Sequence, residues 1–485
     1  MIGIAVSTSS LAWIFVFLAG VPAVTGLLFL FPQRKRLFLG LLAFVVCHVK
    51  KPWYMEVFFE NYRGVDRGFG VTMADLLFFG MGLWLVLGGQ RGKHRLVFWP
   101  WNMGPYVLLT LIGAASLIGS AVPYYGLFTL HKFLRGMVLY WVVVNMVRDR
   151  EDLFAVLRGL FASSVFQLWM VLYGKYVTGE YVNRVVGSFP HPNSLAMYVD
   201  VITPIALAVL LVSSGRKWMD VLAAAAVMAG VVCVIFTKSR AALAIMSLTL
   251  VMAPPITFLL KPSKRQVGLM AAGLVVLSAI GAMAAPKIIK RFNEAPKESA
   301  ETRVYFNHAA LAMAADHPLG TGLNSYSWML ANTHYYWYVY PDKRKEVDNP
   351  REFRYSKHGV SRLGTCHHIY LLFAAETGWI GMYVFLLWIS RFLLFNLVWF
   401  FRARDRLLKA ILLGMLLGFW TLHTQGLLEW IFRQTAVFYE FFLVSGTLVA
   451  MRRMIPMVHA PLWKRLLHGL YQTVPPPSRP IPARA

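Results

Sequence analysis

The chain has 485 residues, of which 58% are hydrophobic and 14% are charged, well below the roughly 25% of charged residues in soluble domains. This composition excludes an ordinary soluble domain, and repeated apolar runs of about 17–25 residues indicate a multi-pass, all-α membrane protein. The formal net charge of +26 could suggest nucleic-acid binding. Much of it lies in short basic clusters between apolar runs, as topology anchors do, so we expect no nucleic-acid partner.

Hydropathy predicts 12 or 13 transmembrane spans along the chain. They lie near residues 10–31, 37–49, 73–89, 104–122, 126–146, 154–174, 195–213, 218–236, 241–260, 267–285, 367–397, 407–423 and 436–450. The second run is short for a span and could be half-buried or re-entrant. The first run lacks a basic leader region and a clear cleavage site, so we expect it to be retained as a helix.

Basic residues orient the predicted bundle, because Lys and Arg gather in cytoplasmic loops. The basic clusters are Arg91/Lys93/Arg95, Arg148/Arg150, Arg216/Lys217, Lys261/Lys264/Arg265, Arg402/Arg404/Arg406 and Arg452/Arg453. The chain then divides into an N-terminal transmembrane bundle (1–285), one large periplasmic loop between the tenth and eleventh spans (286–366), C-terminal transmembrane helices (367–455) and a cytoplasmic, partly disordered tail (456–485).

Short outer loops should contain few cations, so the exceptions need a reason. They are Lys175, Arg184, Lys238, Arg240 and Arg433, with Arg303 and Arg362 in the long loop. Each could simply pair with an acid or a lipid headgroup. The functional alternative is a cationic clamp for a lipid diphosphate, which arginine suits because it binds phosphate through two hydrogen bonds.

Two short outer segments carry several of these cations. Residues 184–194 lead into the seventh span through two prolines, and Asn193 or Ser194 could cap the helix, which leaves Arg184 unexplained. In the turn Thr237–Ala242, Ser239 could cap the ninth span. The amide groups of that helix N-terminus would then favour a bound anion beside Arg240.

A third segment, from Cys366 to Gly381, puts an imidazole where the long loop ends and an apolar helix begins. On a regular helix, Gly378 and Gly381 fall near the face of His367, where they would allow another helix to approach closely. His367 could instead contact a headgroup, and His308, His317, His334, His358 and His368 compete with it.

Placing an acidic side chain in or near a membrane span costs free energy, so such residues are candidates for a functional role. They are Asp75, Asp200, Glu376, Glu429 and Glu440. Glu376 lies roughly opposite His367 on a helix, so we do not expect it to orient that ring.

The three scattered cysteines and the lack of an HExxH pattern or a nucleotide fingerprint predict no metal and no cofactor.

The long loop contains one segment with helical periodicity. Val304, Phe306, Ala309, Ala310 and Met313 form an apolar stripe, and the sequence from Asp316 to Gly322 is typical of a helix end followed by a glycine-rich turn. Arg303 lies near the start of this helix.

Together these motifs resemble the O-antigen ligase/polymerase superfamily of bacterial membrane glycosyltransferases, over roughly residues 180–390. The resemblance rests on an ordered set: Arg184, Gly187 and His191-Pro192-Asn193; Ser239-Arg240-Ala241; Arg303 followed by His317-Pro318-Leu319-Gly320-Thr321-Gly322; and His367 with Gly378 and Gly381. One departure is His368, where the family has Asn, Ser or Gln.

The resemblance implies a metal-independent, cofactor-free GT-C-type transferase of the bacterial inner membrane, with its active site on the periplasmic side. The donor would be a glycan on undecaprenyl diphosphate, and the acceptor a hydroxyl of the lipid A core, in lipopolysaccharide or surface polysaccharide biosynthesis. Arg240 and Arg303 would hold the diphosphate, and His367 would deprotonate or position the acceptor. Arg184, Lys238, His191, Asn193 and His368 would bind substrate.

Three other functions stay open at this point. Within the superfamily, the chain could be an O-antigen or exopolysaccharide polymerase, or a protein O-oligosaccharyltransferase, since the acceptor decides among them. Outside it, a polysaccharide exporter or flippase is a remote alternative. The lack of a detectable internal repeat weighs against a transporter, because many transporters are built from repeated halves.

Overall fold

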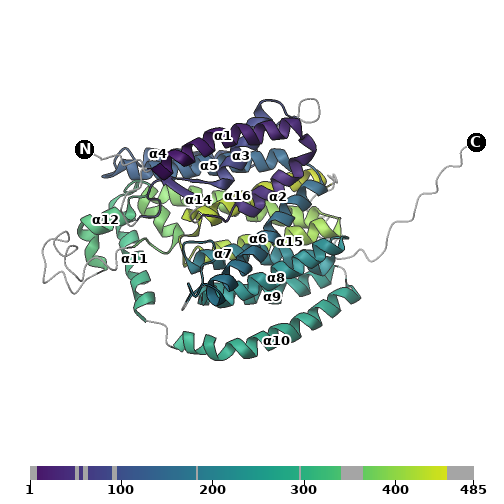
Figure 1. Cartoon of the computed structure of the whole chain (residues 1–485). Coiled ribbons are helices and arrows are strands. Elements are labelled where there is room, and N and C mark those ends of the chain that lie inside the picture. The colour runs from purple at the N-terminus through teal and green to yellow at the C-terminus, as the bar shows by residue number, and fades with distance from the viewer. Residues whose placement is uncertain are drawn as a thin grey trace, which may run out of the picture.

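The computed structural model describes residues 8–49, 54–57, 64–89, 95–181, 184–260, 262–293, 297–339 and 364–455. Within these ranges the chain forms a bundle of helices (Figure 1). Nine of the described helices are long and apolar enough to cross a membrane. The protein is therefore an all-α, multi-pass membrane protein, as its hydropathy predicted. The predicted tail (456–485) and Arg362 lie outside the described residues.

Each of the thirteen predicted apolar runs corresponds to a helix. The first ten are α1 (Thr8–Leu30), α2 (Lys35–Val45), α3 (Met73–Val86), α4 (Met103–Ala115), α5 (Pro123–Met146), α6 (Arg150–Tyr176), α7 (Pro192–Val212), α8 (Lys217–Thr237), α9 (Arg240–Leu260) and α10 (Lys264–Asn293). Three more follow the long loop: α14 (Ile369–Arg402), α15 (Arg406–Gln425) and α16 (Thr435–Met451). A small antiparallel sheet pairs β1 (Tyr54–Val57) with β2 (Phe69–Thr72).

Helix α7 lies at the centre of the bundle, where it packs against α8, α9 and α15 (Figure 1). Its sequence is apolar on all sides, which is typical of a helix surrounded by other helices. Glycines let α15 come close: a Cβ added at Gly414 would lie 2.5 Å from the Cα of Ile205. Such close approach replaces the hydrophobic driving force that is missing between helices in lipid. The start of α7 is thereby fixed relative to the end of α15.

The basic loops meet at one end of the bundle, as the charge pattern predicted. Arg216 pairs with Glu151, and Arg150 with Asp405. Lys35 contacts Asp152 at 2.7 Å, which adds the start of α2 to this end. The functional residues described below lie at the opposite helix ends, where α8 and α15 finish and where α7, α9, α14 and α16 begin.

Helix α2 is short, yet its segment joins the two ends of the bundle. It begins at the basic end with Lys35, and Val49, a few residues after its last turn, lines a cavity at the other end. Residues 64–67 line the same cavity, together with His367. The run 37–49 therefore leads from the basic end of the bundle toward the functional end, and α2 is half-buried, with Leu37 and Leu41 exposed.

The long loop contributes two described helices, α11 (Lys297–Asp316) and α12 (Tyr326–Asn332). The predicted stripe is largely confirmed: Phe306, Ala309, Ala310 and Met313 are buried, and α11 packs against α14. The fifth member, Val304, is 48% exposed because it faces a cavity rather than the bundle. As predicted, α11 ends at Asp316.

Helix α14 is not regular, which corrects the expected role of Gly378. Gly378 has φ 71° and ψ 174°, and the helix is kinked there. A turn of the long loop, rather than another helix, packs at this kink. Its backbone binds α14 through Thr321 N to Ala375 O (2.9 Å) and Gly322 N to Glu376 O (3.0 Å). The kink therefore attaches the loop domain to the transmembrane bundle.

We expect Gly378→Ala to destabilise the fold by about 3 kcal/mol or more. Its backbone conformation is restricted to glycine, at a cost of roughly 1–3 kcal/mol for other residues, and the added Cβ would collide with the carbonyl oxygen of Pro318. Thermal unfolding of the detergent-solubilised protein measures this loss. The matched control is Gly273→Ala on α10, where an added Cβ meets no atom within 4 Å. An unchanged Tm for Gly378→Ala would contradict the kink.

Candidate active site

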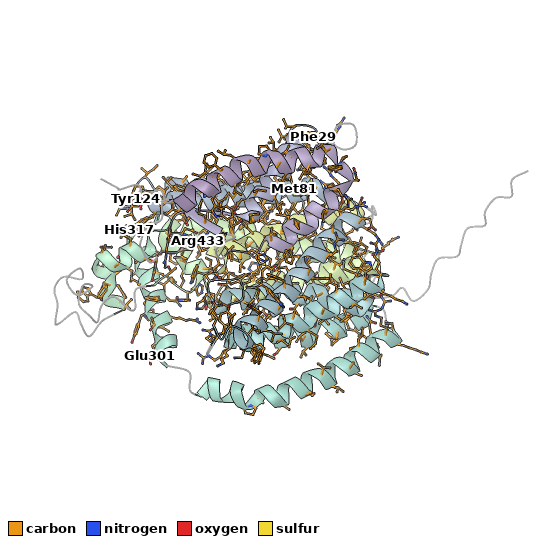
Figure 2. All side chains as sticks on the ribbon, viewed as in Figure 1. Phe29, Met81, Tyr124, Glu301, His317 and Arg433 are labelled. Atoms are coloured by element: carbon orange, nitrogen blue, oxygen red, sulfur yellow. The ribbon has the colours of Figure 1, made fainter. Side chains whose placement is uncertain are left out.

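Six of the predicted site residues line one cavity at the functional end of the bundle, with a volume of about 340 Å³. They are Arg184, Asn193, Lys238, Arg240, Arg303 and His367. These residues come from the connection before α7, the turn between α8 and α9, helix α11 and the start of α14. In Figure 2 the labelled Glu301 marks the part of α11 that carries Arg303.

The turn between α8 and α9 presents two cations to this cavity. Helix α8 ends at Thr237 and α9 begins at Arg240, and Lys238 between them adopts a left-handed conformation with φ 54°. Such a conformation is unfavourable for a lysine and persists where surrounding contacts enforce it. Arg184 supplies one such contact, since its Nε donates to the Thr237 carbonyl at 2.8 Å. Arg184 therefore holds the turn in place, besides lining the cavity.

Glu429, in the connection between α15 and α16, links the site residues. Its Oε1 accepts hydrogen bonds from Arg303 Nη2 (2.8 Å) and Asn193 Nδ2 (2.5 Å). Its Oε2 lies 3.0 Å from Nδ1 of His367. The residue is only 6% exposed, so these partners replace the water that a carboxylate normally binds. One carboxylate thus fixes an arginine, an asparagine and an imidazole from three distant segments.

Asn193 extends this network to Arg184, whose Nη2 donates to Asn193 Oδ1 at 2.7 Å. The amide group therefore bridges Arg184 and Glu429. The helix cap predicted for Asn193 or Ser194 is supplied by His191 instead, whose Nδ1 accepts from the Asn193 backbone amide at 3.2 Å. The side chain of Asn193 is released by this arrangement and points to the site rather than back to its own helix.

The ionisation of Glu429 defines the tautomer of His367. Burial would raise the pKa of Glu429, but the hydrogen bond and charge of His367 and the charge of Arg303 outweigh it, so its pKa lies below the ordinary value. An ionised carboxylate can only accept hydrogen bonds. Nδ1 of His367 must therefore carry the proton, which leaves the lone pair of the neutral ring on Nε2. That nitrogen can act as a base.

His368 has a different place. Its Nδ1 accepts a hydrogen bond from the Leu371 amide at 3.3 Å, so its side chain caps α14. Burial lowers the pKa of His368. Among the residues that line the two cavities described here, His368 is absent. The geometry thus favours His367 as the base, although a substrate-binding role for His368 stays a prediction.

A second, larger cavity, of about 540 Å³, also reaches His367. His367 and Glu429 line both cavities. The larger one also contains His191, Asp66, Arg67 and Arg433 in its wall. The imidazole and its carboxylate therefore lie at the junction of two cavities, and a group bound in either could reach them.

Buried ion pairs support the wall of the larger cavity. Arg433 is fully buried and donates to Glu376 at 2.8 Å, and it lies inside the bundle in Figure 2. This pairing accounts for an outer-loop arginine that the topology rule did not explain. It also gives Glu376 a partner other than His367, as its position on the helix predicted. Lys132 on α5 binds Asp66 and donates to the Arg433 carbonyl at 2.5 Å.

Glu429 is the main site residue that the sequence did not assign. Its only signal was an acid beside an apolar span, a property that it shares with Asp75, Asp200 and Glu440. Asp75 binds Arg135 and Tyr439 inside the bundle, and Asp200 binds Gln425. Nothing local distinguishes Glu429 from these acids, because its partners lie 62, 126 and 236 residues away in the chain.

The fold and the site define a multi-pass membrane protein with a cationic cavity and a carboxylate-held imidazole at one end of its bundle. The sequence model of the O-antigen ligase family matches residues 223–386, which identifies this part of the chain as an O-antigen ligase domain and confirms the predicted superfamily. Members of this family are membrane glycosyltransferases and ligases, which supports an enzymatic function. The matched range includes Lys238, Arg240, Arg303 and His367. A search among curated proteins found no match.

The depressed pKa of Glu429 predicts how stability depends on pH. The stabilisation by its carboxylate is complete above its unfolded-state value of about 4.5 and is lost as the pH falls through the lower folded-state pKa. We expect the Tm difference between wild type and Glu429→Gln to shrink as the pH falls below about 4.5, where the carboxylate takes up a proton. Thermal unfolding above and below this pH measures the difference.

The matched control for this experiment is Glu301→Gln, which removes an exposed carboxylate from α11 two residues before Arg303. Its Tm should follow the wild type at every pH. If Glu429→Gln also followed the wild type throughout, Glu429 would not be an ionised, bonded carboxylate in the folded protein.

Proposed function

We propose that the protein transfers a glycan from undecaprenyl diphosphate to an acceptor hydroxyl, most simply on the lipid A core, without a metal ion. It would act in the bacterial inner membrane with its active site on the periplasmic side. The observation that carries the proposal is the smaller cavity, in which four cationic side chains surround an imidazole held by a buried carboxylate. This is the arrangement that a diphosphate leaving group and a hydroxyl nucleophile require.

The sidedness of the site follows from charge. The basic loops, which the positive-inside rule assigns to the cytoplasm, are joined by ion pairs at one end of the bundle. The cavity lies at the opposite helix ends. A periplasmic site is supported by this separation, since a lipid-linked glycan assembled for the cell surface would be used on the outer side.

The cations of the smaller cavity suit a diphosphate. Arg303 is one-third exposed, so part of its guanidinium can bind phosphate while one nitrogen stays on Glu429. Lys238 and Arg240 are exposed at the start of α9, where free amide groups also favour an anion. Donors aimed at a developing negative charge stabilise the transition state, and each contributes on the order of 3 kcal/mol.

His367 would deprotonate the acceptor. As the acceptor oxygen forms a bond to the anomeric carbon, the bond from that carbon to the diphosphate oxygen breaks, and the electron pair leaves with the diphosphate. The hydroxyl proton moves to Nε2 of His367, and Glu429 stabilises the resulting imidazolium. The released diphosphate can later take up this proton. A positioned base of this kind contributes roughly 10²–10⁴-fold in rate.

We expect His367→Ala and Arg303→Ala to fold but to lose transfer activity, by about 10²–10⁴-fold and 10²–10³-fold respectively. The first variant removes the base, and the second removes a donor to the leaving group. The assay uses purified protein, a lipid-linked donor extracted from membranes, and purified acceptor. The control is His308→Ala, an exposed histidine on α11, which should be as active as wild type.

Two outcomes of this assay would contradict the proposal. Near-normal turnover by His367→Ala would reassign the base, and His368→Ala would then be measured next. Activity should also persist in excess chelator, because cationic side chains are proposed to bind the diphosphate. A loss in chelator that added metal restores would show that a metal is required.

Deletion of the gene tests the choice of acceptor. For a ligase we expect lipid A to lose its polymer while lipid-linked chains of full length persist, because only the last transfer is blocked. Gel analysis of the lipopolysaccharide and mass spectrometry of the lipid-linked fraction measure both. A single repeat left on lipid A would instead assign the chain to the polymerase branch, and unchanged lipopolysaccharide with an unglycosylated protein would indicate a protein O-oligosaccharyltransferase.

A further inference from the structure

The two cavities meet at the pair formed by His367 and Glu429, and a transfer reaction needs two substrates at its base. In a displacement at the anomeric carbon, the attacking oxygen approaches opposite to the leaving group. If the diphosphate occupies the smaller cavity, the acceptor must therefore approach from another side of His367. The larger cavity, of about 540 Å³, opens on that residue and can hold several sugar rings.

We propose, on the basis of the proposed function, that the larger cavity binds the acceptor glycan and that Arg67 binds an acidic group which this acceptor carries near the attacked hydroxyl. The acidic group is a carboxylate or a phosphate, since a guanidinium binds either through two hydrogen bonds.

The charges in the wall of the larger cavity single out Arg67. Arg433 is bonded to Glu376, and Asp66 is bonded to Lys132 and to Thr129 (2.5 Å). Glu429 is occupied by the site network. Arg67 is half-buried, and it forms no ion pair with any residue in the described part of the chain. It is thus a cation in this wall whose charge is available to a ligand.

The backbone that carries Arg67 is held firmly. Asn324 Nδ2 donates to the Asp66 carbonyl at 2.8 Å, and the Asp66 carboxylate binds side chains of α5. Burial would raise the pKa of Asp66, but the nearby charges of Lys132 and Arg433 lower it, so the carboxylate stays ionised. A cation on a fixed segment loses less conformational entropy when it binds a ligand. This rigidity is what a specificity-determining contact requires.

The diphosphate does not explain Arg67. Four other cations already line the smaller cavity, and Arg67 is in the wall of the larger one. The acid that Arg67 binds must therefore belong to the second substrate. The acceptor class that fits is an acidic oligosaccharide rather than a neutral glycan.

The test uses full-length protein and three octyl trisaccharides that differ in one substituent on the sugar next to the accepting one: a hydroxyl, a carboxylate or a phosphate. The donor is the lipid-linked glycan extracted from the deletion strain. Wild type should use the two acidic acceptors with a kcat/KM about tenfold or more above the neutral one. Arg67→Gln should abolish this preference by raising the acceptor KM, with donor KM unchanged, and Arg67→Lys should retain part of it.

The matched control is Lys238→Gln, which removes one cation from the smaller cavity. It should raise the KM of the donor and leave that of the acceptor unchanged, the reverse of Arg67→Gln. If Arg67→Gln instead raised the donor KM, the larger cavity would hold the diphosphate and the inference would be wrong. A wild type that did not distinguish acidic from neutral acceptors would overturn the role of Arg67.

Direct binding of the same trisaccharides to donor-free protein separates this inference from the proposed function. Absence of transfer to any acceptor by wild type would count against the proposed function. Binding that is tighter for the acidic trisaccharides and loses that preference in Arg67→Gln would still support the cavity assignment. If Arg67→Gln fails to give monodisperse protein, the loss of preference in Arg67→Lys relative to wild type decides, and full retention there overturns the inference.

Discussion

A buried, ionised carboxylate is the constraint on which the site depends. An unpartnered carboxylate at the position of Glu429 would cost several kcal/mol of desolvation, and only well-formed hydrogen bonds offset that cost. The partners are Arg303, Asn193 and His367, which lie on α11, α7 and at the start of α14. Docking of the loop helix α11 on the transmembrane bundle therefore supplies one of the three partners that stabilise Glu429 as an anion. Assembly of the site and docking of the long loop are thus coupled.

The same carboxylate separates the tasks of the two cavities. The smaller cavity is lined by one acid, Glu429, and by four cations, Arg184, Lys238, Arg240 and Arg303. It therefore stays cationic even though Glu429 partly neutralises Arg303. The proposed diphosphate would therefore find a positive potential there, while Glu429 holds the imidazole next to it through Nδ1 and leaves Nε2 to accept a proton. Without this acid, the positive charge that the imidazole gains on accepting a proton would face only the cations of the cavity. The carboxylate lets strong cations and a proton acceptor coexist within one cavity.

Hydropathy was sufficient to predict the helices, because lipid forces every apolar run to satisfy its own backbone hydrogen bonds. Arg240 could be selected because it breaks the topology rule, whereas Arg303, in the long loop, could be selected only through the family resemblance. The kink at Gly378 and the orientation of the Asn193 side chain could not be predicted, because both depend on contacts with other segments: the turn at Pro318 in one case and Glu429 in the other. The role of Glu429 could not be predicted for the same reason, since its partners lie up to 236 residues away and leave no periodic pattern in the sequence.

The buried ion pairs in the wall of the larger cavity are subject to the same cost of desolvation as Glu429. Removing one member of a buried pair such as Arg433 and Glu376 typically costs 3–5 kcal/mol, so these groups constrain the structure strongly although they touch no solvent. Lys132 binds both the Asp66 carboxylate and the Arg433 carbonyl, and it thereby ties together two segments that line this cavity. In the smaller cavity, Lys238 and Arg240 are exposed, so their long side chains could adjust to a flexible diphosphate. The larger one has walls fixed by buried charge, which suits discrimination between related glycans, and this contrast supports the proposed role of the larger cavity in acceptor selectivity.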